Sequence, residues 1–268
     1  MKIIIAGDGK VGLTLTQKLA AAGHDLTLID SNQRVLDSSV ERYDVMGVQG
    51  NCASMRVLES ADETVAVSTE SGYKNPLGTV NEGWGEVFMG ATMESVLVGY
   101  NDPRLIKYYS KAEGGDIKDE KGNLIIAERN KIAGTYKGVP QGTGVTVKDE
   151  NRYRLHSKST ITKQTDAILM TAAEVWFLRA EAALRGFTSE NVKDCYEKGI
   201  TVSCQQWGVN VGDYLTSDAT PSDYVDAFEA KYDVKALIKV TPKWDGGASP
   251  EEQLERILTQ KWIACYPE

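Results

Sequence analysis

The chain has 268 residues, of which 41% are hydrophobic and 25% are charged, and its formal net charge at pH 7 is −8. These values are ordinary for a globular protein with one large domain or two small ones. The acidic excess excludes a basic surface that follows a phosphate backbone, so we expect no nucleic-acid partner.

The cysteines, the histidines and the apolar runs exclude further classes of protein. The chain has two histidines and no Cys-x-x-Cys pair, so we expect no metal site and free, mostly buried thiols. No run approaches the roughly 18 apolar residues of a membrane helix. Only four apolar residues separate Lys2 from Gly7, which is too short for the core of a signal peptide. Its own N-terminus therefore predicts a cytoplasmic chain. The cysteines are Cys52, Cys195, Cys204 and Cys265.

The first sixty residues alternate between two kinds of apolar pattern. Short apolar runs at 2–6, 26–29 and 45–49 predict buried parallel strands. Between them, helical spacing predicts one helix that ends at Gly23 and a second from Ser31 to about Arg42. The expected face of the first helix is Val11, Leu15, Leu19 and Ala22. This order predicts an α/β half-Rossmann unit, β-α-β-α-β.

A glycine-rich turn joins the first strand to the first helix. Gly7 permits a tight turn, Gly9 lets backbone approach a pyrophosphate, and Gly12 lets the helix close on the strand. Asp30 ends the second strand, where its carboxylate would hold ribose hydroxyls and repel a 2′-phosphate. We therefore expect NAD(H) rather than NADP(H), with packing alone as the alternative role of the glycines. The complete turn is Gly7, Asp8, Gly9, Lys10, Val11 and Gly12.

The runs KIIIAGDGKVG, GHDLTLID and YDVMGVQGNCASMRVLESA carry a narrower likeness. Together they resemble the N-terminal nucleotide-binding domain of TrkA, also called RCK or KTN, from regulators of potassium uptake. The resemblance implies that the turn and Asp30 contact nucleotide, and that Gly50, Asn51 and Ser54 form a loop near the adenosine. It also implies a potassium transporter membrane subunit as partner. Asp8 departs from the family's usual small residue.

The alternation stops soon after this segment. Residues 64–69 could imitate a fourth strand, but no further alternation of strands and helices follows. We therefore expect a partial nucleotide-binding segment at 1–63 and a second segment at 64–268. A short helix is expected at 86–98, followed by the turn Asn101-Asp102-Pro103-Arg104, and then loops with short strands over 110–160.

Three stronger helices are predicted toward the C-terminus. They lie at 165–187, at 190–206 and from Pro250 onward. The first two have the shape of a single tetratricopeptide-like unit, which needs neighbours to cover its face. Trp176 and Trp262 fall on expected packing faces and are predicted to be structural. The expected packing face of the first helix is Leu169, Ala172, Ala173, Trp176, Ala180, Ala183 and Leu184.

The runs YKNPLGTVNEGWGEVFMGATMESVLVGYNDPRL, LMTAAEVWFLRAEAALRGF and LERILTQKWIACYPE resemble the SusD/RagB family over about residues 65–268. The family consists of outer-membrane lipoproteins that bind glycans or other nutrients. The resemblance implies a mainly α, tetratricopeptide-like fold with long loops, an outer-membrane location and a TonB-dependent transporter as partner. Four features of the family are not found in this sequence. They are the signal peptide, the lipid-bearing cysteine, the N-terminal helices and the continuation of the family pattern beyond Glu268.

Sugar binding rests on exposed aromatic faces with a few polar partners. Five aromatic residues lie in or beside expected loops and are the candidates for ligand contact, with a place in the core as the alternative for each. They are Trp84, Tyr100, Tyr108, Tyr109 and Tyr136.

Motifs for catalysis are absent from the sequence, including GxSxG, GxxxxGK[ST], HExxH and zinc-spaced Cys/His sets. We therefore expect a binding protein and no enzyme. A SusD-like nutrient-binding segment with a foreign N-terminus ranks first, a TrkA-type sensor second and an NAD-dependent oxidoreductase third. Because the two resemblances imply different compartments, we interpret the chain as a fused or misassembled reading frame with a seam between about Glu59 and Ser68.

Overall fold

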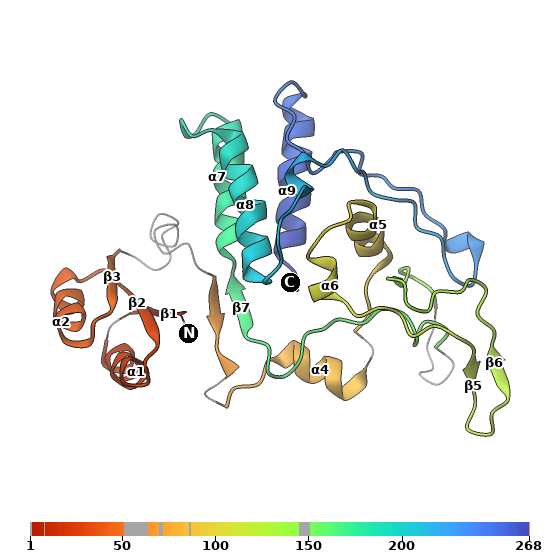
Figure 1. Cartoon of the computed structure of the whole chain (residues 1–268), viewed down its shortest axis with the longest axis horizontal. Helices are drawn as coiled ribbons and strands as arrows, with labels where there is room; N and C mark the ends of the chain where they lie inside the picture. Colours follow the sequence, from red (N-terminus) through yellow and green to blue (C-terminus); the bar gives the residue numbers. More distant parts are fainter. Residues whose placement is uncertain are drawn as a thin grey trace.

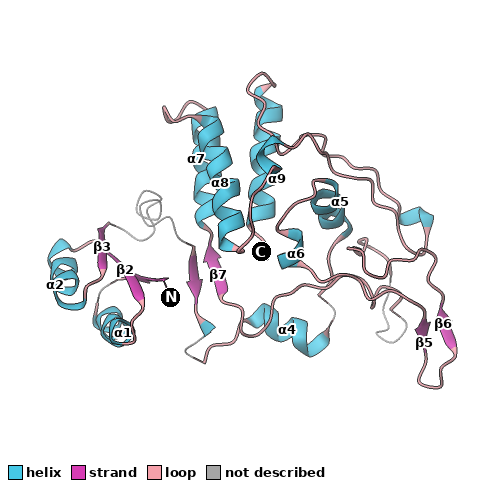
Figure 2. Ribbon diagram, in the orientation of Figure 1, coloured by secondary structure: helices cyan, strands magenta, loops and turns pink. Residues whose placement is uncertain are grey.

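A small α/β body stands beside a larger body of helices and long loops in this computed structural model (Figures 1 and 2). The three longest helices stand at the centre of the view, and long loops lead from them to a two-stranded ribbon at the right. The structure describes residues 2–7, 9–50, 64–69, 72–85, 87–144 and 151–267.

The N-terminal body is a parallel sheet with two helices. Its strands pair in the order β1-β2-β3, with Ile5 opposite Leu28 and Ile29 opposite Val48. The predicted order of strands and helices is confirmed. The elements are β1 (Lys2–Ala6), α1 (Lys10–Ala21), β2 (Asp25–Asp30), α2 (Gln33–Tyr43) and β3 (Met46–Gln49).

Helix α1 covers the sheet with a different face from the one predicted. Leu15 is 46% exposed, whereas Thr16 is fully buried and its hydroxyl donates to the carbonyl of Gly12 at 2.9 Å. Leu19 packs as predicted, but Ala22 lies past the end of the helix and is exposed. The buried face of the helix instead includes Gly12, where an added methyl group would meet the Gly7 oxygen and the Ile5 side chain of β1. The core of this body is Ile5, Leu26, Leu28, Leu36 and Val45.

The expected fourth strand forms, but it belongs to another sheet. Strand β4 (Val65–Val67) pairs antiparallel with β7 (Ala167–Met170), far along the chain. The segment therefore imitates a fourth strand, as expected, without extending the first sheet. The choice of partner is a long-range contact, which a local pattern cannot specify.

Short elements and loops fill the middle of the chain. The predicted helix at 86–98 begins later than expected, because Phe88 and Gly90 form isolated bridges with Lys158 and Val139. In the described parts of 110–160, namely 110–144 and 151–160, the expected loops with short strands are present. The elements are α4 (Pro76–Trp84), α5 (Ala91–Gly99), α6 (Leu105–Tyr108), β5 (Ile117–Lys118) and β6 (Leu124–Ile126).

Three long helices carry most of the core, namely α7 (Ala172–Leu184), α8 (Val192–Gln206) and α9 (Pro250–Ala264). Helix α7 begins later than predicted because the preceding residues belong to β7. Leu169 therefore lies on a strand and is 62% exposed, which contradicts its predicted place on the packing face. Ser249 and Glu252 form a capping box at the predicted start of α9.

Close contact between α7 and α8 depends on one glycine. A methyl group on Gly199 would lie 2.9 Å from the ring of Phe177, which is itself fully buried. Trp262, predicted to pack, is 41% exposed, so this expectation is wrong. Trp176 is half-buried against the core, and the Arg179 guanidinium lies 3.9 Å from the centre of its ring.

The two bodies meet through a small apolar contact. Ile29 of β2 packs with Val175 of α7, and both side chains are almost fully buried. Val48 and Met170 complete this cluster. Within the described ranges, no helix is long and apolar enough to cross a membrane.

Candidate functional site

The glycines in the turn of the N-terminal body have different roles. Gly7 and Gly12 are required by the fold, whereas Gly9 leaves space beside α1. Gly7 has φ +90°, and its amide donates to the carbonyl of Ile29 at 2.7 Å, so it makes the tight turn. A methyl group on Gly12 would lie 1.9 Å from the Gly7 oxygen, so this glycine is required for packing. A methyl group on Gly9 would meet no described atom within 4 Å, although Gly9 caps α1. The space where a phosphate would approach is therefore open.

The other predicted nucleotide residues gather at the same edge of the sheet. Asp30 ends β2, its Oδ1 accepts from the Asn32 amide at 2.8 Å, and its carbonyl accepts from the Gly50 amide at 2.9 Å. Gly7 is bonded to the neighbouring residue of β2, so these positions meet at the carboxyl ends of the strands, where such sheets bind ligands. Asp8, Asn51 and Ser54 lie outside the described residues, as do the side chains of Lys10 and Val11.

Three of the five aromatic candidates are core residues. Tyr100 and Tyr108 are 1% and 0% exposed, and their hydroxyls donate to the carbonyls of Val240 at 2.7 Å and Ile263 at 3.0 Å. Tyr109 is 6% exposed and packs edge-on against Tyr108. The expectation that these three rings offer a face to ligand is wrong, because α5 and α6 turn them inward against α8 and α9.

The other two candidates lie nearer the surface. Trp84 is 65% exposed at the end of α4, where Gly85 in the left-handed conformation closes the helix. Tyr136 is half-buried against the helical core. Burial raises the pKa of its phenol. Trp84 is therefore the one described candidate that offers a broad aromatic face.

A buried ion pair holds the turn after α5. Asp102 accepts from Arg104 Nη2 at 2.6 Å and from Arg104 Nε at 2.9 Å, and both side chains have no exposed surface. Arg104 also donates to Ser203 of α8 and to Gln260 of α9. Burial opposes the charge on Arg104, but the Asp102 carboxylate outweighs it and holds the pKa of the guanidinium above its usual value. The turn is thus fixed to α8 and α9.

That turn forms one side of an open groove. Two adjoining hollows of about 640 Å³ and 410 Å³ share Asn101, Pro103 and Asn210 as lining residues. We call this surface, lined by parts of 100–107 and 208–217, the Asn101 groove. Asn101 has φ +52°, a conformation that asparagine tolerates better than most residues, and its side chain is exposed. Asn210 Oδ1 accepts from the Gly212 amide at 2.8 Å.

The groove is lined by carboxamides and apolar side chains, with Lys107 and Asp213 as charged residues among the rest of its lining. Carboxamides offer both donors and acceptors, while Pro103 and Ile106 provide apolar surface beside them. Asp102 is occupied by its buried partner, so it is not placed to act as a general acid. The sequence pattern predicted only the turn at 101–104. The groove could not be predicted in this way, because its two sides are about a hundred positions apart in the chain.

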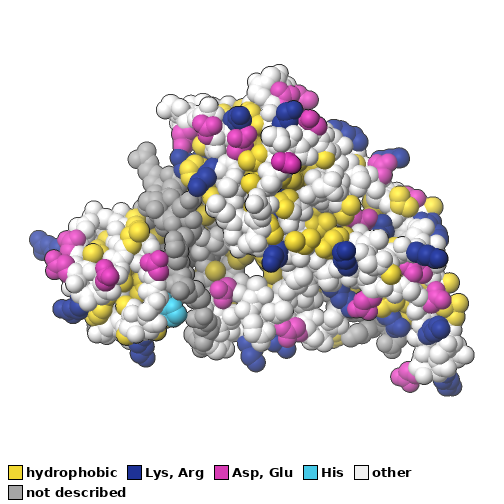
Figure 3. Space-filling model, viewed as in Figure 1, with side chains coloured by type: hydrophobic (Ala, Val, Ile, Leu, Met, Phe, Trp, Pro, Cys, Tyr) yellow, Lys and Arg dark blue, Asp and Glu magenta, His cyan; other side chains and the backbone are white. Residues whose placement is uncertain are grey.

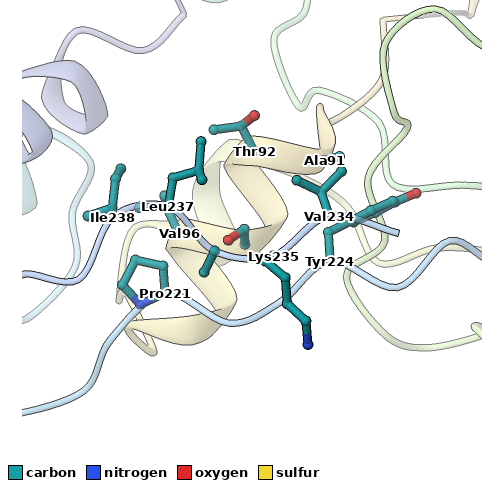
Figure 4. Close-up of a pocket in the computed structure, with 11 residues that line it drawn as sticks. Ala91, Thr92, Val96, Pro221, Tyr224, Val234, Lys235, Leu237 and Ile238 are labelled. Atoms are coloured by element: carbon teal, nitrogen blue, oxygen red, sulfur yellow. The ribbon is translucent and has the colours of Figure 1, made fainter. Parts of the chain in front are cut away.

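A second, apolar cavity of about 190 Å³ lies between α5 and residues 221–238. Figure 4 shows Val96, Pro221 and Leu237 around it. In the described part of the chain, no three His, Cys, Asp or Glu side chains form a metal-binding group. Cys195 and Cys204 are buried, as predicted for most of the thiols, and burial raises the pKa of the Cys204 thiol to about 11.

Two family models match this chain. The SusD-like model, described as Susd and RagB outer membrane lipoprotein, matches residues 49–268. The TrkA-N domain model matches residues 3–68. The two matches overlap, and the SusD-like one begins earlier than the residue 65 expected from the sequence. Much of the overlap lies outside the described residues, so the boundary at 63/64 stays a prediction.

Curated relatives match the N-terminal segment. The potassium uptake protein TrkA of Haemophilus influenzae is 43% identical over 61 residues, which are 23% of this chain and 13% of that protein. A TrkA homologue from Methanothermobacter thermautotrophicus is 36% identical over 62 residues, 23% of this chain and 29% of that protein. The match thus covers a small part of each relative.

Solved structures of SusD homologues match most of the chain. A SusD homologue from Bacteroides vulgatus is 38% identical with a TM-score of 0.66, covering 97% of this chain and 48% of that one. A chitin-binding SusD homologue from Flavobacterium johnsoniae is 33% identical with a TM-score of 0.61, covering 73% of this chain and 38% of that one. The chain therefore spans about half the length of these structures or less.

Proposed function

The chain belongs to the SusD-like family, and we propose from this premise that it is a non-catalytic protein that binds a glycan in the Asn101 groove. The observation that carries the proposal is a groove that presents carboxamides beside apolar surface. Sugars need this combination, because their hydroxyls form hydrogen bonds and their C–H faces lie on apolar groups. The turn that carries Asn101 is held by the buried Asp102–Arg104 pair, so little ordering accompanies binding.

The chitin-binding homologue suggests the first ligand to test. We expect calorimetry to show saturable binding of a chitin-derived tetrasaccharide, with glucan oligosaccharides as the comparison. The variant Asn101→Gly keeps the backbone conformation and removes the carboxamide, and it should raise the dissociation constant about tenfold. Asn210→Asp keeps the oxygen that caps the loop but loses the donor, so it should weaken binding as well.

Trp84→Ala is the variant that tests the alternative site. If the exposed ring on α4 is the stacking platform, Trp84→Ala should abolish binding while Asn101→Gly changes nothing. That result would move the site to α4, and absence of glycan binding in the unmodified chain would refute the proposal.

From membership of the SusD-like family, we further propose that the chain transfers its ligand to a TonB-dependent transporter at the outer membrane. Copurification of the transporter with the chain from native cells tests this proposal.

We also propose that the N-terminal body is half of a Rossmann domain that binds NAD(H), as in TrkA-type regulators of potassium transporters. The open space at Gly9 and the position of Asp30 support this role. Calorimetry should show NADH binding more tightly than NADPH, and Gly9→Val should abolish binding because its side chain occupies the phosphate's approach. Equal affinity for both nucleotides, or unchanged binding in Gly9→Val, would contradict the proposal.

The pairing of α7 with α8 supports a third, structural proposal, that these helices form one tetratricopeptide-like unit. Such a unit presents a face for neighbouring helices, which agrees with the family's architecture. The exposed Trp262 on the adjacent α9 would then be covered in a longer SusD-like protein. Coexpression with the N-terminal helices of a homologue should reduce solvent quenching of tryptophan fluorescence if this is so.

A further inference from the structure

An apolar cavity of about 190 Å³ separates helix α5 from residues 221–238. Ala91 and Val96 of α5 form one wall, and Pro221, Tyr224 and Leu237 lie across from them. Figure 3 shows hydrophobic side chains gathered over α5 and α6 on this face of the molecule. The cavity is separate from the Asn101 groove, with which it shares no lining residue.

Hydrogen bonds between the wall segments hold the walls of the cavity together without a ligand. Ser95 Oγ donates to the carbonyl of Ser222 at 2.6 Å, and the Ser222 amide donates to the carbonyl of Ser95 at 2.9 Å. Tyr224 and Val234 exchange backbone hydrogen bonds at 2.9 and 3.0 Å. The cavity is therefore formed before a ligand enters, which lowers the cost of binding.

The mouth of the cavity carries no net charge. Lys235 is the one cation in the lining, and its amine bonds Asp223 at 2.6 Å. In Figure 4 its side chain extends away from the other labelled residues. The other oxygen of Asp223 accepts from the Ala236 amide at 2.9 Å. A charged ligand would have no partner here and would lose its hydration, so the site selects a neutral group.

Two side chains at the rim are unusually exposed for their type. Leu237 is 86% exposed and Val234 is 51% exposed, although both line the cavity. A ligand that enters would cover part of this apolar surface and remove it from water. Exposure at the rim and an apolar interior therefore favour the same kind of occupant.

From these observations, we propose that the cavity binds a small neutral molecule through one apolar ring. Its volume is close to that of the roughly 150 Å³ apolar cavity that accepts benzene in an engineered protein. A disaccharide would be too large and too polar for this lining. The site thus adds a second ligand class to a chain whose proposed function concerns sugars, and it does not depend on that function.

Benzyl alcohol and benzoate are the probes that test the proposal, since they share a ring and differ in charge. With the full chain, ligand-observed NMR should show saturable binding of benzyl alcohol with a dissociation constant on the order of 1 mM. Benzoate should bind at least about tenfold more weakly, because its carboxylate would lose hydration without a partner. Equal binding of both probes, or no saturable binding of benzyl alcohol, would overturn the proposal.

Two exposed positions locate the site without endangering the fold. Leu237→Ser should weaken benzyl alcohol about fivefold by removing apolar rim surface, and Thr92→Phe should abolish binding by filling the mouth. Leu169→Ser is the matched control, an exposed leucine on β7 that should leave binding unchanged. If Thr92→Phe leaves binding intact, or if Leu237→Ser instead dissociates a dimer in sedimentation experiments, the cavity is not the site proposed.

Discussion

The helical body and the N-terminal body bury their apolar residues on different scales. The helical core runs from Met89 to Tyr266 and joins α5, α6, α7, α8 and α9 in one cluster. It also encloses the Asp102–Arg104 pair, whose guanidinium donates to α8 and to α9. Among the residues that the structure describes, the N-terminal core cluster holds five buried residues from the three-stranded sheet, α2 and the segment before β3.

The difference concerns how each body depends on the rest of the chain. Removal of apolar area from water scales with the size of the core, so the larger cluster supports cooperative folding on its own. The small body has little apolar surface to bury within itself. Ile29 packs against Val175 of α7, which adds buried apolar surface. All five tryptophans lie in the larger body, so their fluorescence reports its unfolding separately.

The largest expected effect comes from breaking the buried ion pair. Arg104→Leu leaves the Asp102 carboxylate buried without a partner, which should cost about 3–5 kcal/mol of unfolding free energy. Urea unfolding followed by tryptophan fluorescence would measure it. Arg185→Leu, which removes a partly exposed pair with Glu181, is the control and should change little. If both variants unfold at the same urea concentration, the pair does not hold the helical body.

Gly12→Ala tests the small body alone. Its new methyl group would clash with the Gly7 carbonyl, so α1 must move off the sheet and nucleotide binding should be lost. Tryptophan-monitored unfolding should stay unchanged, because the clash lies outside the helical core. Gly9→Ala has open space and is the control for folding. If Gly12→Ala lowers the unfolding free energy measured by tryptophan fluorescence, the two bodies fold as one unit.

Acid should weaken the helical body through His156. Burial lowers the pKa of this imidazole to about 4, with the positive charge of Lys137 acting in the same direction. The folded-state pKa lies below the unfolded value of about 6.5, so the stabilisation is present above pH 6.5 and is lost as the pH falls toward 4. The loss should reach roughly 3 kcal/mol at the low end of that window.

Comparison with a variant isolates this contribution from that of the carboxylates. His156→Phe keeps an aromatic ring beside Tyr153 and Phe228 and cannot be protonated. Its unfolding free energy should fall less between pH 6.5 and 4 than that of the unmodified chain. His24→Phe, in the small body, should leave the tryptophan-monitored pH dependence as it was. Parallel pH profiles for His156→Phe and the unmodified chain would contradict the assignment.

The smallest effect concerns exposed apolar surface. We expect poor expression, loose packing where the bodies meet and binding of a dye specific for apolar surface, because Phe187 is 78% exposed and Leu169 is 62% exposed. Phe187→Ser should lower dye fluorescence with little change in melting temperature. A single sharp thermal transition without dye binding in the unmodified chain would show that the two bodies form one well-packed unit.

Local patterns determined the order of elements within each body. The strand-turn-helix alternation of the first fifty residues, the separate duties of Gly7 and Gly12, and the start of α9 at Pro250 all follow from residues close together in the chain. These features depend on periodicity, backbone conformation and capping, which a short stretch of sequence contains. The candidate residues of the nucleotide site could also be identified from a short stretch of sequence, since its glycines and Asp30 belong to one β-α-β unit.

Only the tertiary structure decided what lies between distant segments. The pairing of β4 with β7, the burial of Tyr100 and the exposure of Leu169 each depend on contacts across many residues. The Asn101 groove likewise exists only because the turn after α5 meets the loop after α8. Sequence periodicity tells which side chains share a face but not which neighbour covers that face, and this neighbour determines whether an aromatic ring meets a ligand or the core.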